Sequence, residues 1–190
     1  DPAGTWNSGY RYGSSRIRCF SHIHSWQLSG IPVMPVPAHV GTHEDFDEYS
    51  SRFSHASEEA TPGYYGVELS DHGIRAELTA TERVGFHRYR FRGASSATLL
   101  LNLGADLGPC SMSAAFVGRT AANEVSGFVE NDTTRRRNKR CRIYFVMRVD
   151  RTIDALLIGS RAEQATWKAI SDLPTGIDGL SPCGCAALHV

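Results

Sequence analysis

Two histidines, a tryptophan and a glutamine occur close together near the start of this 190-residue chain, in Phe20-Ser21-His22-Ile23-His24-Ser25-Trp26-Gln27. On an extended strand successive side chains alternate between the two faces, so His22, His24 and Trp26 would share one face. An indole can stack on a sugar ring, and imidazole nitrogens can hydrogen-bond sugar hydroxyls. The segment therefore predicts a carbohydrate-binding or metal-binding surface, with a partly buried polar strand as the alternative.

The spacing of His22 and His24 also allows a transition-metal site of the kind found in cupins. Such a site would have a Glu a few residues after the second histidine, and none occurs in Ser25-Trp26-Gln27-Leu28-Ser29. Hydrogen bonding to a sugar or to a domain interface is therefore the preferred interpretation for His24, and a structural role for His22. A metal-dependent, cupin-like enzyme is the weakest of the functional alternatives.

The composition of the chain argues against two classes of partner, nucleic acid and membranes. It carries 20 Lys plus Arg and 20 Asp plus Glu, so no net electric field would attract nucleic acid or an anionic membrane. No apolar run approaches the roughly 20 residues of a membrane-spanning helix, and the first residues lack the features of a signal peptide. The basic run 135–140 lacks interleaved aromatic residues and is interpreted as a solvated loop. We expect a soluble domain with neither nucleic acid nor a membrane as partner.

Strands must position these residues. Short runs rich in Val, Ile, Thr and aromatic residues recur, and turn-forming sequences such as Asp71-His72-Gly73 separate them. The predicted strands are 66–69, 74–80, 84–91, 97–103, 112–117, 125–130, 142–149, 155–158 and 185–190. Weak helical character occurs only at 160–170, interpreted as a loop with a turn of helix. This rhythm predicts one all-β domain, an antiparallel β-sandwich.

Two of these strands predict specific patterns of burial. In 74–80 the apolar residues alternate with Arg75, Glu77 and Thr79, which indicates one buried face and one wet face. The run Thr98-Leu99-Leu100-Leu101 does not alternate, so this strand is expected to be buried on both faces.

The cysteines are an odd and scattered set of five: Cys19, Cys110, Cys141, Cys183 and Cys185. At least one is therefore free or paired outside the chain. The spacing of Cys183 and Cys185 differs from that of a zinc knuckle and is awkward for a mutual disulfide. A structural role in the core is predicted for the cysteines.

Several motifs occur in an order that extends over nearly the whole chain. They are Gly9-Tyr10-Arg11-Tyr12, the segment 20–27, Met34-Pro35, Arg52-Phe53-Ser54-His55, Pro62-Gly63-Tyr64-Tyr65, residues 76–89, Ser126-Gly127-Phe128 and Arg142-Ile143-Tyr144-Phe145. In this order they resemble the N-terminal domain of glycoside hydrolase family 92, whose members are calcium-dependent exo-acting α-mannosidases. No single motif is specific for this family, but the order of the motifs along the chain is.

The resemblance implies a two-domain enzyme in which an N-terminal β-sandwich packs on an (α/α)6 barrel, with the mannose pocket at their junction. Residues 1–190 would be the sandwich, incomplete at both ends, and the catalytic barrel would not be present in this chain. The family's general acid, general base and most calcium ligands belong to the barrel. No catalytic residue and no metal ligand is therefore assigned here, and calcium is expected in the full-length enzyme but not in this fragment.

The resemblance also implies partners and a location. The expected partners are a mannose-containing glycan and the missing (α/α)6 catalytic domain, and the expected location is secreted or periplasmic. A homodimer is a further expected partner, because truncation at both ends would expose strand edges and apolar surface. An inverting glycosidase needs two carboxyl groups about 6.5 to 9.5 Å apart. Glu58 and Glu59 are adjacent, so in an extended segment they would diverge to opposite faces, and the acidic cluster at 44–48 is interpreted as a solvated loop. This fragment alone is predicted to be inactive.

Five residues are assigned to substrate binding from the resemblance: Trp26, His24, Gln27, Phe128 and Val129. Trp26 occupies the position of an aromatic against the sugar, with plain core as the alternative, and Phe128 matches a second pocket aromatic. The family often has Cys where this chain has Val129, so only backbone contacts carry over there. The predicted function is the non-catalytic sandwich of an inverting exo-α-mannosidase, contributing walls of the mannose pocket. The alternative is a stand-alone carbohydrate-binding or interaction module.

Overall fold

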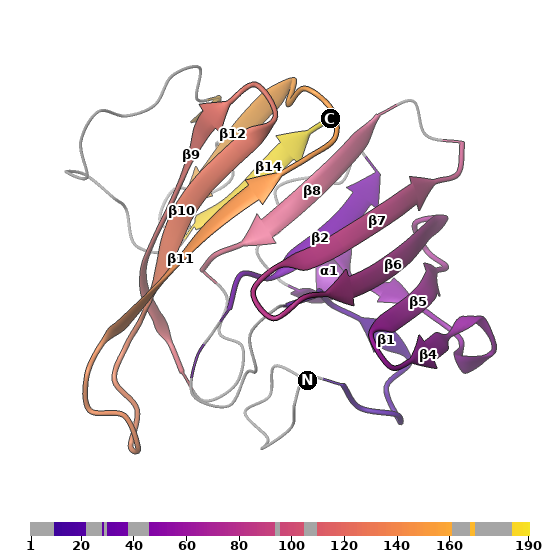
Figure 1. Ribbon diagram of the computed structural model, residues 1–190, viewed down its shortest axis with the longest axis horizontal. Coiled ribbons are helices and arrows are strands. Elements are labelled where there is room, and N and C mark those ends of the chain that lie inside the picture. Colours follow the sequence, from indigo (N-terminus) through magenta and orange to yellow (C-terminus); the bar gives the residue numbers. More distant parts are fainter. Residues whose placement is uncertain are drawn as a thin grey trace.

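The computed structural model is built almost entirely of strands in the residues that it describes, which are 10–21, 28, 30–37, 46–93, 96–104, 110–160, 168–169 and 184–190 (Figure 1). In chain order the strands are β1 (Arg16–Ile17), β2 (Val33–Pro37), β3 (Ser51–Arg52), β4 (Glu59–Thr61), β5 (Tyr64–Leu69), β6 (Ile74–Ala80), β7 (Gly85–Phe91), β8 (Ala97–Asn102), β9 (Met112–Ala121), β10 (Glu124–Asn131), β11 (Cys141–Arg148), β12 (Ala155–Ser160), β13 (Lys168–Ala169) and β14 (Gly184–His189). Within the described ranges the helical elements are α1 (Phe46–Tyr49) and the 3-10 helix η1 (His55–Ser57). None of the described segments forms a helix long and apolar enough to cross a bilayer.

Antiparallel pairing organises these strands into sheets. A five-stranded sheet has the order β13-β12-β14-β8-β2, a four-stranded sheet the order β4-β5-β6-β7, and a three-stranded sheet the order β11-β10-β9, while β1 pairs with β3. Each pairing is antiparallel. The prediction of an all-β antiparallel sandwich is confirmed.

The five-stranded sheet is buried on both faces. Its strand β8 contributes Leu99 and Leu101 to one apolar cluster and Leu100 to another. Because successive side chains point to opposite faces, a strand between two cores needs a continuous apolar run. Thr98 is 1% exposed and Leu101 0%, so the predicted burial of this strand on both faces is confirmed.

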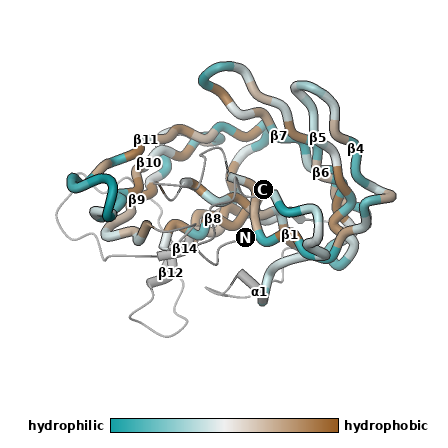
Figure 2. Tube along the Cα trace, turned by 90° about the horizontal axis from the view of Figure 1, so that it is seen from below, coloured by the Kyte–Doolittle hydropathy of each residue, from teal (hydrophilic) through white to brown (hydrophobic). Residues whose placement is uncertain are grey.

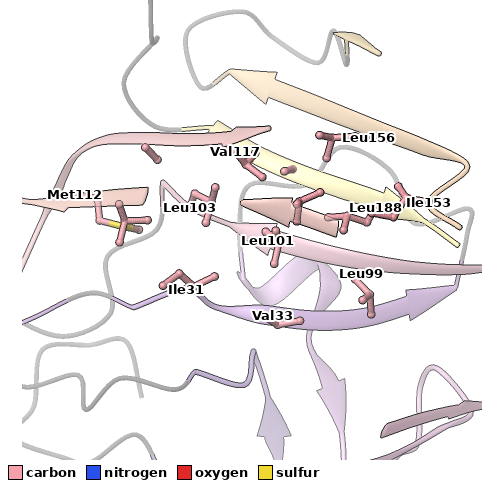
Figure 3. Packing of buried hydrophobic residues seen from close by; sticks show 14 residues of the cluster. Ile31, Val33, Leu99, Leu101, Leu103, Met112, Val117, Ile153, Leu156 and Leu188 are labelled. Atoms are coloured by element: carbon pink, nitrogen blue, oxygen red, sulfur yellow. The ribbon is translucent and has the colours of Figure 1, made fainter. Parts of the chain in front are cut away.

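The two smaller sheets cover these faces. The first cluster joins Leu99 and Leu101 to Val117 of β9 (Figure 3). The second joins Leu100 to Val67 of β5 and Ile74 of β6. Complete burial of an aliphatic side chain of this size stabilises the fold by roughly 1.5–3 kcal/mol, so the two clusters hold the three sheets together.

Strand β6 shows the predicted division between a buried and a wet face. Ile74 and Ala76 are 0% exposed and Thr79 is exposed, but Ala80, the last residue of the predicted buried face, is exposed as well because it lies at the end of the strand. Glu77 lies on the wet face but is only 9% exposed. Arg88 of β7 covers it with two hydrogen bonds, from Nε to Oε2 at 2.9 Å and from Nη2 to Oε1 at 2.8 Å. The carboxylate is thus shielded by its own partners.

Strand boundaries predicted from the sequence differ from the observed ones by a few residues. Strand β9 continues to Ala121 because its ladder with β10 extends to the pair of Ala121 and Glu124. In the weakly helical region, Lys168 and Ala169 form β13 and pair with β12, so strand pairing overrides the local preference there. Residues 161–167 and 170–183 lie outside the described residues.

The connection between β10 and β11 is the hydrophilic hairpin end visible in Figure 2. Arg135 and Arg136 are exposed there, whereas Arg137 is half-buried and donates from Nη2 to the carbonyl O of Asp132 at 2.6 Å. The interpretation of this basic run as a solvated loop is confirmed, with Arg137 as an internal brace.

The described cysteines Cys19, Cys110 and Cys141 form no disulfide; Cys110 is buried in the core as predicted, whereas Cys19 and Cys141 are half-buried. Cys110 is 1% exposed and its Sγ lies 3.4 Å from Nη2 of Arg137. Burial raises the pKa of Cys19 to about 12, against the opposing charge of Arg18. A thiol that ionises so reluctantly is a poor nucleophile, which agrees with the predicted structural role.

Candidate functional site

The segment that carries three of the predicted ligand contacts begins at Phe20. Phe20 and Val33 exchange backbone hydrogen bonds of 2.8 Å, and the Phe20 ring is 8% exposed. Its ring centroid lies 6.2 Å from that of His87 and 6.3 Å from that of Tyr89. The start of the segment is thereby fixed to β2 and β7. The predicted contacts that follow it, His24, Trp26 and Gln27, lie outside the described residues, and their roles stay predictions.

Phe128 occupies the centre of an aromatic row across the three-stranded sheet. The register places Phe116 of β9 opposite it on one side and Tyr144 of β11 on the other. The ring centroid of Phe128 lies 6.2 Å from that of Phe116 and 5.8 Å from that of Tyr144. Phe128 is 5% exposed and Tyr144 is 71% exposed. The row therefore offers an aromatic surface whose outermost ring is Tyr144.

Charged side chains border this row. The guanidinium of Arg142 lies over the Phe128 ring, and its Nε donates to Oε2 of Glu130 at 2.7 Å. Glu130 also accepts from Oγ of Ser113 at 3.1 Å. The hydrogen bond from Arg142 lowers the pKa of Glu130, against the effect of its burial. Glu130 is thus an ionised brace for Arg142 rather than a candidate general acid.

Val129 points to the opposite face from Phe128. Its side chain is 0% exposed and belongs to the first apolar cluster, and its register partners are Ala115 and Ile143. Both neighbouring strands therefore pair with its backbone. The structure gives Val129 a packing role, and its backbone contact with a ligand stays a prediction.

The preceding residue, Gly127, lies where two strands approach each other closely. A Cβ at this position would stand 2.0 Å from the carbonyl O of Phe116 and 3.0 Å from the ring of Phe145. No side chain fits in that space. The glycine of Ser126-Gly127-Phe128 thus lets β10 approach β9, which aligns Phe128 with Phe116.

Glu58 and Glu59 contact different partners, as their adjacency predicts. Glu58 accepts a hydrogen bond from the hydroxyl of Tyr65 at 2.6 Å, whereas Glu59 lies 3.5 Å from Nη2 of Arg75. They do not form a pair that could bracket a sugar. In the part of the chain that the structure describes, no group of three His, Cys, Asp or Glu residues is arranged to hold a metal ion. The described residues therefore provide no carboxylate cluster of the kind that binds calcium.

Sequence reasoning missed Phe116, Tyr144 and Arg142 as neighbours of Phe128. Between 12 and 16 residues separate each of them from Phe128 in the chain. Only the strand register brings them together, and a shift of one residue would turn each side chain to the other face.

The chain matches the Glycosyl hydrolase family 92 N-terminal domain over residues 1–175. It belongs to this family. Among curated proteins, none matches the chain. The family 92 N-terminal domain thus accounts for most of the sequence, including the Ser126-Gly127-Phe128 motif and the aromatic row around it.

Solved structures share the fold of this family 92 domain. The family GH92 alpha-mannosidase BT3965 from Bacteroides thetaiotaomicron, in complex with mannoimidazole, is 23% identical with a TM-score of 0.73 over 96% of this chain and 25% of its own. The gh92 family glycosyl hydrolase ccman5 is 24% identical with a TM-score of 0.71, covering 96% of this chain and 25% of its own. The Family GH92 Inverting Mannosidase BT2199 from Bacteroides thetaiotaomicron VPI-5482 is 18% identical with a TM-score of 0.65, covering 95% and 23%. The chain spans about a quarter of the length of these proteins.

Proposed function

We propose that this chain forms the non-catalytic sandwich of a calcium-dependent exo-α-mannosidase that acts on mannose-containing glycans, and that it contributes walls of the mannose pocket. Its membership of the family 92 N-terminal domain supports this proposal. The observation that carries the pocket-wall role is the row of Phe116, Phe128 and Tyr144, because it places the aromatic of the family motif beside an exposed ring.

In this proposal the chain binds and orients, while the general acid, the general base and the calcium ligands belong to an (α/α)6 barrel outside these 190 residues. Trp26 would stack on the apolar face of the terminal sugar, and His24 and Gln27 would hydrogen-bond its hydroxyls. Phe128 would close the wall on the side of β10 once the guanidinium of Arg142, which covers its ring, has moved aside. The protein would be secreted or periplasmic, where such glycans are found.

Hydrolysis assays test the division of labour. The chain alone should release no product from aryl α-mannosides or mannobiose, with or without calcium, because in this proposal both carboxyl groups needed for inversion belong to the barrel. A protein that also contains the barrel is the positive control. Calcium-dependent turnover by the chain alone would refute the non-catalytic assignment.

A titration with methyl α-mannoside tests the pocket wall. The chain has three tryptophans, and Trp26→Phe identifies the indole N–H signal of Trp26 in 1H–15N spectra. A ligand-dependent shift of this signal, with the other two unchanged, is the expected result. Titration in the presence of the barrel repeats the test where the pocket is complete, and an unchanged Trp26 signal there would contradict the role.

A second candidate is a stand-alone carbohydrate-binding module. Tyr144 is 71% exposed and Val146 on the same strand face is 68% exposed, and an exposed aromatic beside an apolar side chain can bind a sugar face. In that case Tyr144→Ala should abolish retention of the chain on a mannan column, while Trp26→Ala should leave retention unchanged. The opposite pattern would support the pocket wall.

A further inference from the structure

His55 stands at the start of η1, on a turn that neighbouring groups hold in place. Ser54 caps this turn, because its Oγ accepts a hydrogen bond from the backbone N of Ala56 at 3.2 Å. Arg75 of β6 donates from Nη1 to the carbonyl O of Ser57 at 2.8 Å. The imidazole therefore projects from a fixed backbone.

Both ring nitrogens of His55 face hydrogen-bond acceptors. Nδ1 contacts Oε2 of Glu58, and Nε2 lies 2.7 Å from the carbonyl O of Tyr12. A neutral imidazole carries one N–H and can donate to only one of two such acceptors, whereas an imidazolium donates to both. The geometry therefore favours the protonated ring.

Glu58 supplies the balancing negative charge. It accepts hydrogen bonds from the hydroxyls of Tyr65 at 2.6 Å and Tyr10 at 3.3 Å. Burial raises the pKa of Glu58, but the hydrogen bonds that it accepts outweigh this effect and lower the pKa. The hydrogen bond to Glu58 in turn raises the pKa of His55, against the effect of burial and with help from the Tyr12 carbonyl.

Two aromatic rings and one further cation complete the surroundings of His55. The Tyr12 ring is stacked on the imidazole with centroids 4.1 Å apart and planes at 7°, and Phe53 meets it edge-on at 5.3 Å. A cationic ring gains electrostatically from an aromatic face. Arg75 is the cation packed against η1, and its pairing with Glu59 at 3.5 Å offsets its repulsion of a protonated imidazole.

We propose that protonated His55 anchors residues 10–14 to the body of the domain and releases them when it loses its proton. The Tyr12 carbonyl lies beside Nε2 of His55, the Tyr12 ring stacks on the imidazole, and the Tyr10 hydroxyl donates a hydrogen bond to Glu58. From there the chain continues to Ser15, whose carbonyl O accepts from the backbone N of Phe53 at 3.1 Å, and then into β1. The anchor is therefore a proton-dependent contact between residues 10–14 and the turn that carries His55. It does not rest on the proposed function.

The direction of the pH dependence follows from the raised pKa of His55. Its contribution is complete below the ordinary histidine pKa of about 6.5. It is lost as the pH rises through the raised value of the folded protein. Above that value the protonated fraction falls about tenfold per pH unit.

NMR titration of the imidazoles and amide hydrogen exchange of residues 10–14 test the anchor in the 190-residue chain. We expect His55 to titrate above about 6.5, and the exchange protection of these amides, corrected for intrinsic rates, to fall at least about tenfold between about pH 6 and about pH 9. Glu58→Gln should return the pKa of His55 towards its ordinary value and move the loss of protection to lower pH. The matched control is His72→Gln, which removes an imidazole whose Nε2 lies 2.8 Å from the carbonyl O of Tyr49. This control should leave the pH dependence unchanged.

Two results would overturn the proposal. One is a His55 that titrates at or below about 6.5, and the other is equal protection of residues 10–14 in acid and in base. If Glu58→Gln does not fold, the titration of the unmodified chain and the exchange profile of His55→Gln still decide the matter. A pH dependence of protection that persists in His55→Gln would be a third result that overturns the proposal, because a group other than His55 would then control it.

Discussion

The guanidinium carbon of Arg142 lies 4.8 Å from the ring centroid of Phe128. Glu130 holds the same guanidinium at 2.7 Å, so one side chain makes both a cation–π contact and an ion pair. The Arg142 side chain and the rings of Phe116 and Tyr144 together cover Phe128. This explains why the Phe128 ring, which lies on the outward face of the sheet, is only 5% exposed. A sugar that stacks on the face of Phe128 would first have to displace Arg142.

Replacement of Phe128 should cost more stability than replacement of Tyr144. Phe128→Ala removes a buried ring and should lower the free energy of unfolding by about 3 kcal/mol. Tyr144→Ala removes a ring that is 71% exposed and should cost about 1 kcal/mol or less. Urea denaturation of both variants measures the difference, and equal losses would contradict the burial of Phe128.

Gly127→Ala should destabilise the domain through backbone crowding. The new Cβ would stand 2.0 Å from the carbonyl O of Phe116, so β9 and β10 must separate, at a cost of about 2 kcal/mol or more. Gly13→Ala is the control, because nothing lies within 4 Å of a Cβ there. Thermal unfolding of the two variants should show a large fall in Tm for the first and little change for the second. A similar Tm for both would show that the strands can move apart freely.

Glu77 should make the stability of the domain sensitive to acid. The hydrogen bond from Arg88, helped by Tyr64 and opposed by burial, lowers the pKa of Glu77 to about 2. A depressed pKa contributes stability that is present above the unfolded value of about 4.3 and is lost as the pH falls through the folded value. The stability difference between the unmodified chain and Glu77→Gln should therefore shrink from about pH 4.3 downward.

Chemical denaturation as a function of pH measures this difference. Glu82→Gln is the matched control, because Glu82 is 88% exposed and lies 4.0 Å from Arg83. The stability of Glu82→Gln should differ little from that of the unmodified chain at any pH. A constant stability difference for Glu77→Gln across the acid range would contradict the depressed pKa.

Trp26→Ala in a protein that also contains the barrel distinguishes a pocket role from a core role. A stacked indole contributes about 1 to 3 kcal/mol by analogy with base stacking, so kcat/KM should fall by about tenfold to a hundredfold with Tm nearly unchanged. If the ring is in the core, truncation should instead cost about 3 to 5 kcal/mol of stability. Kinetics and melting measured on the same variant decide, and a large loss of stability would refute the pocket role.

The sequence by itself determined the fold class, most strands and the family. Alternation in 74–80 identified which face of β6 would be wet, because a strand repeats every two residues. The unbroken apolar run in Thr98-Leu99-Leu100-Leu101 identified a strand between two cores. Turn residues such as Gly73, which has a φ of 63°, marked where hairpins reverse. These features are local, and short stretches of sequence carry them completely.

Only the tertiary structure decided which side chains meet. The position of Phe128 between Phe116 and Tyr144 depends on the register of three strands, and no residue type within one strand reveals that register. The two acceptors of His55 likewise come from Glu58, three residues away, and from Tyr12, 43 residues away. The sequence showed a histidine in a family motif, whereas the preference of this histidine for the protonated state arises from its contact with Glu58, together with the contact with the distant backbone carbonyl of Tyr12. Contacts between distant segments follow from packing and strand pairing, which a local pattern does not encode.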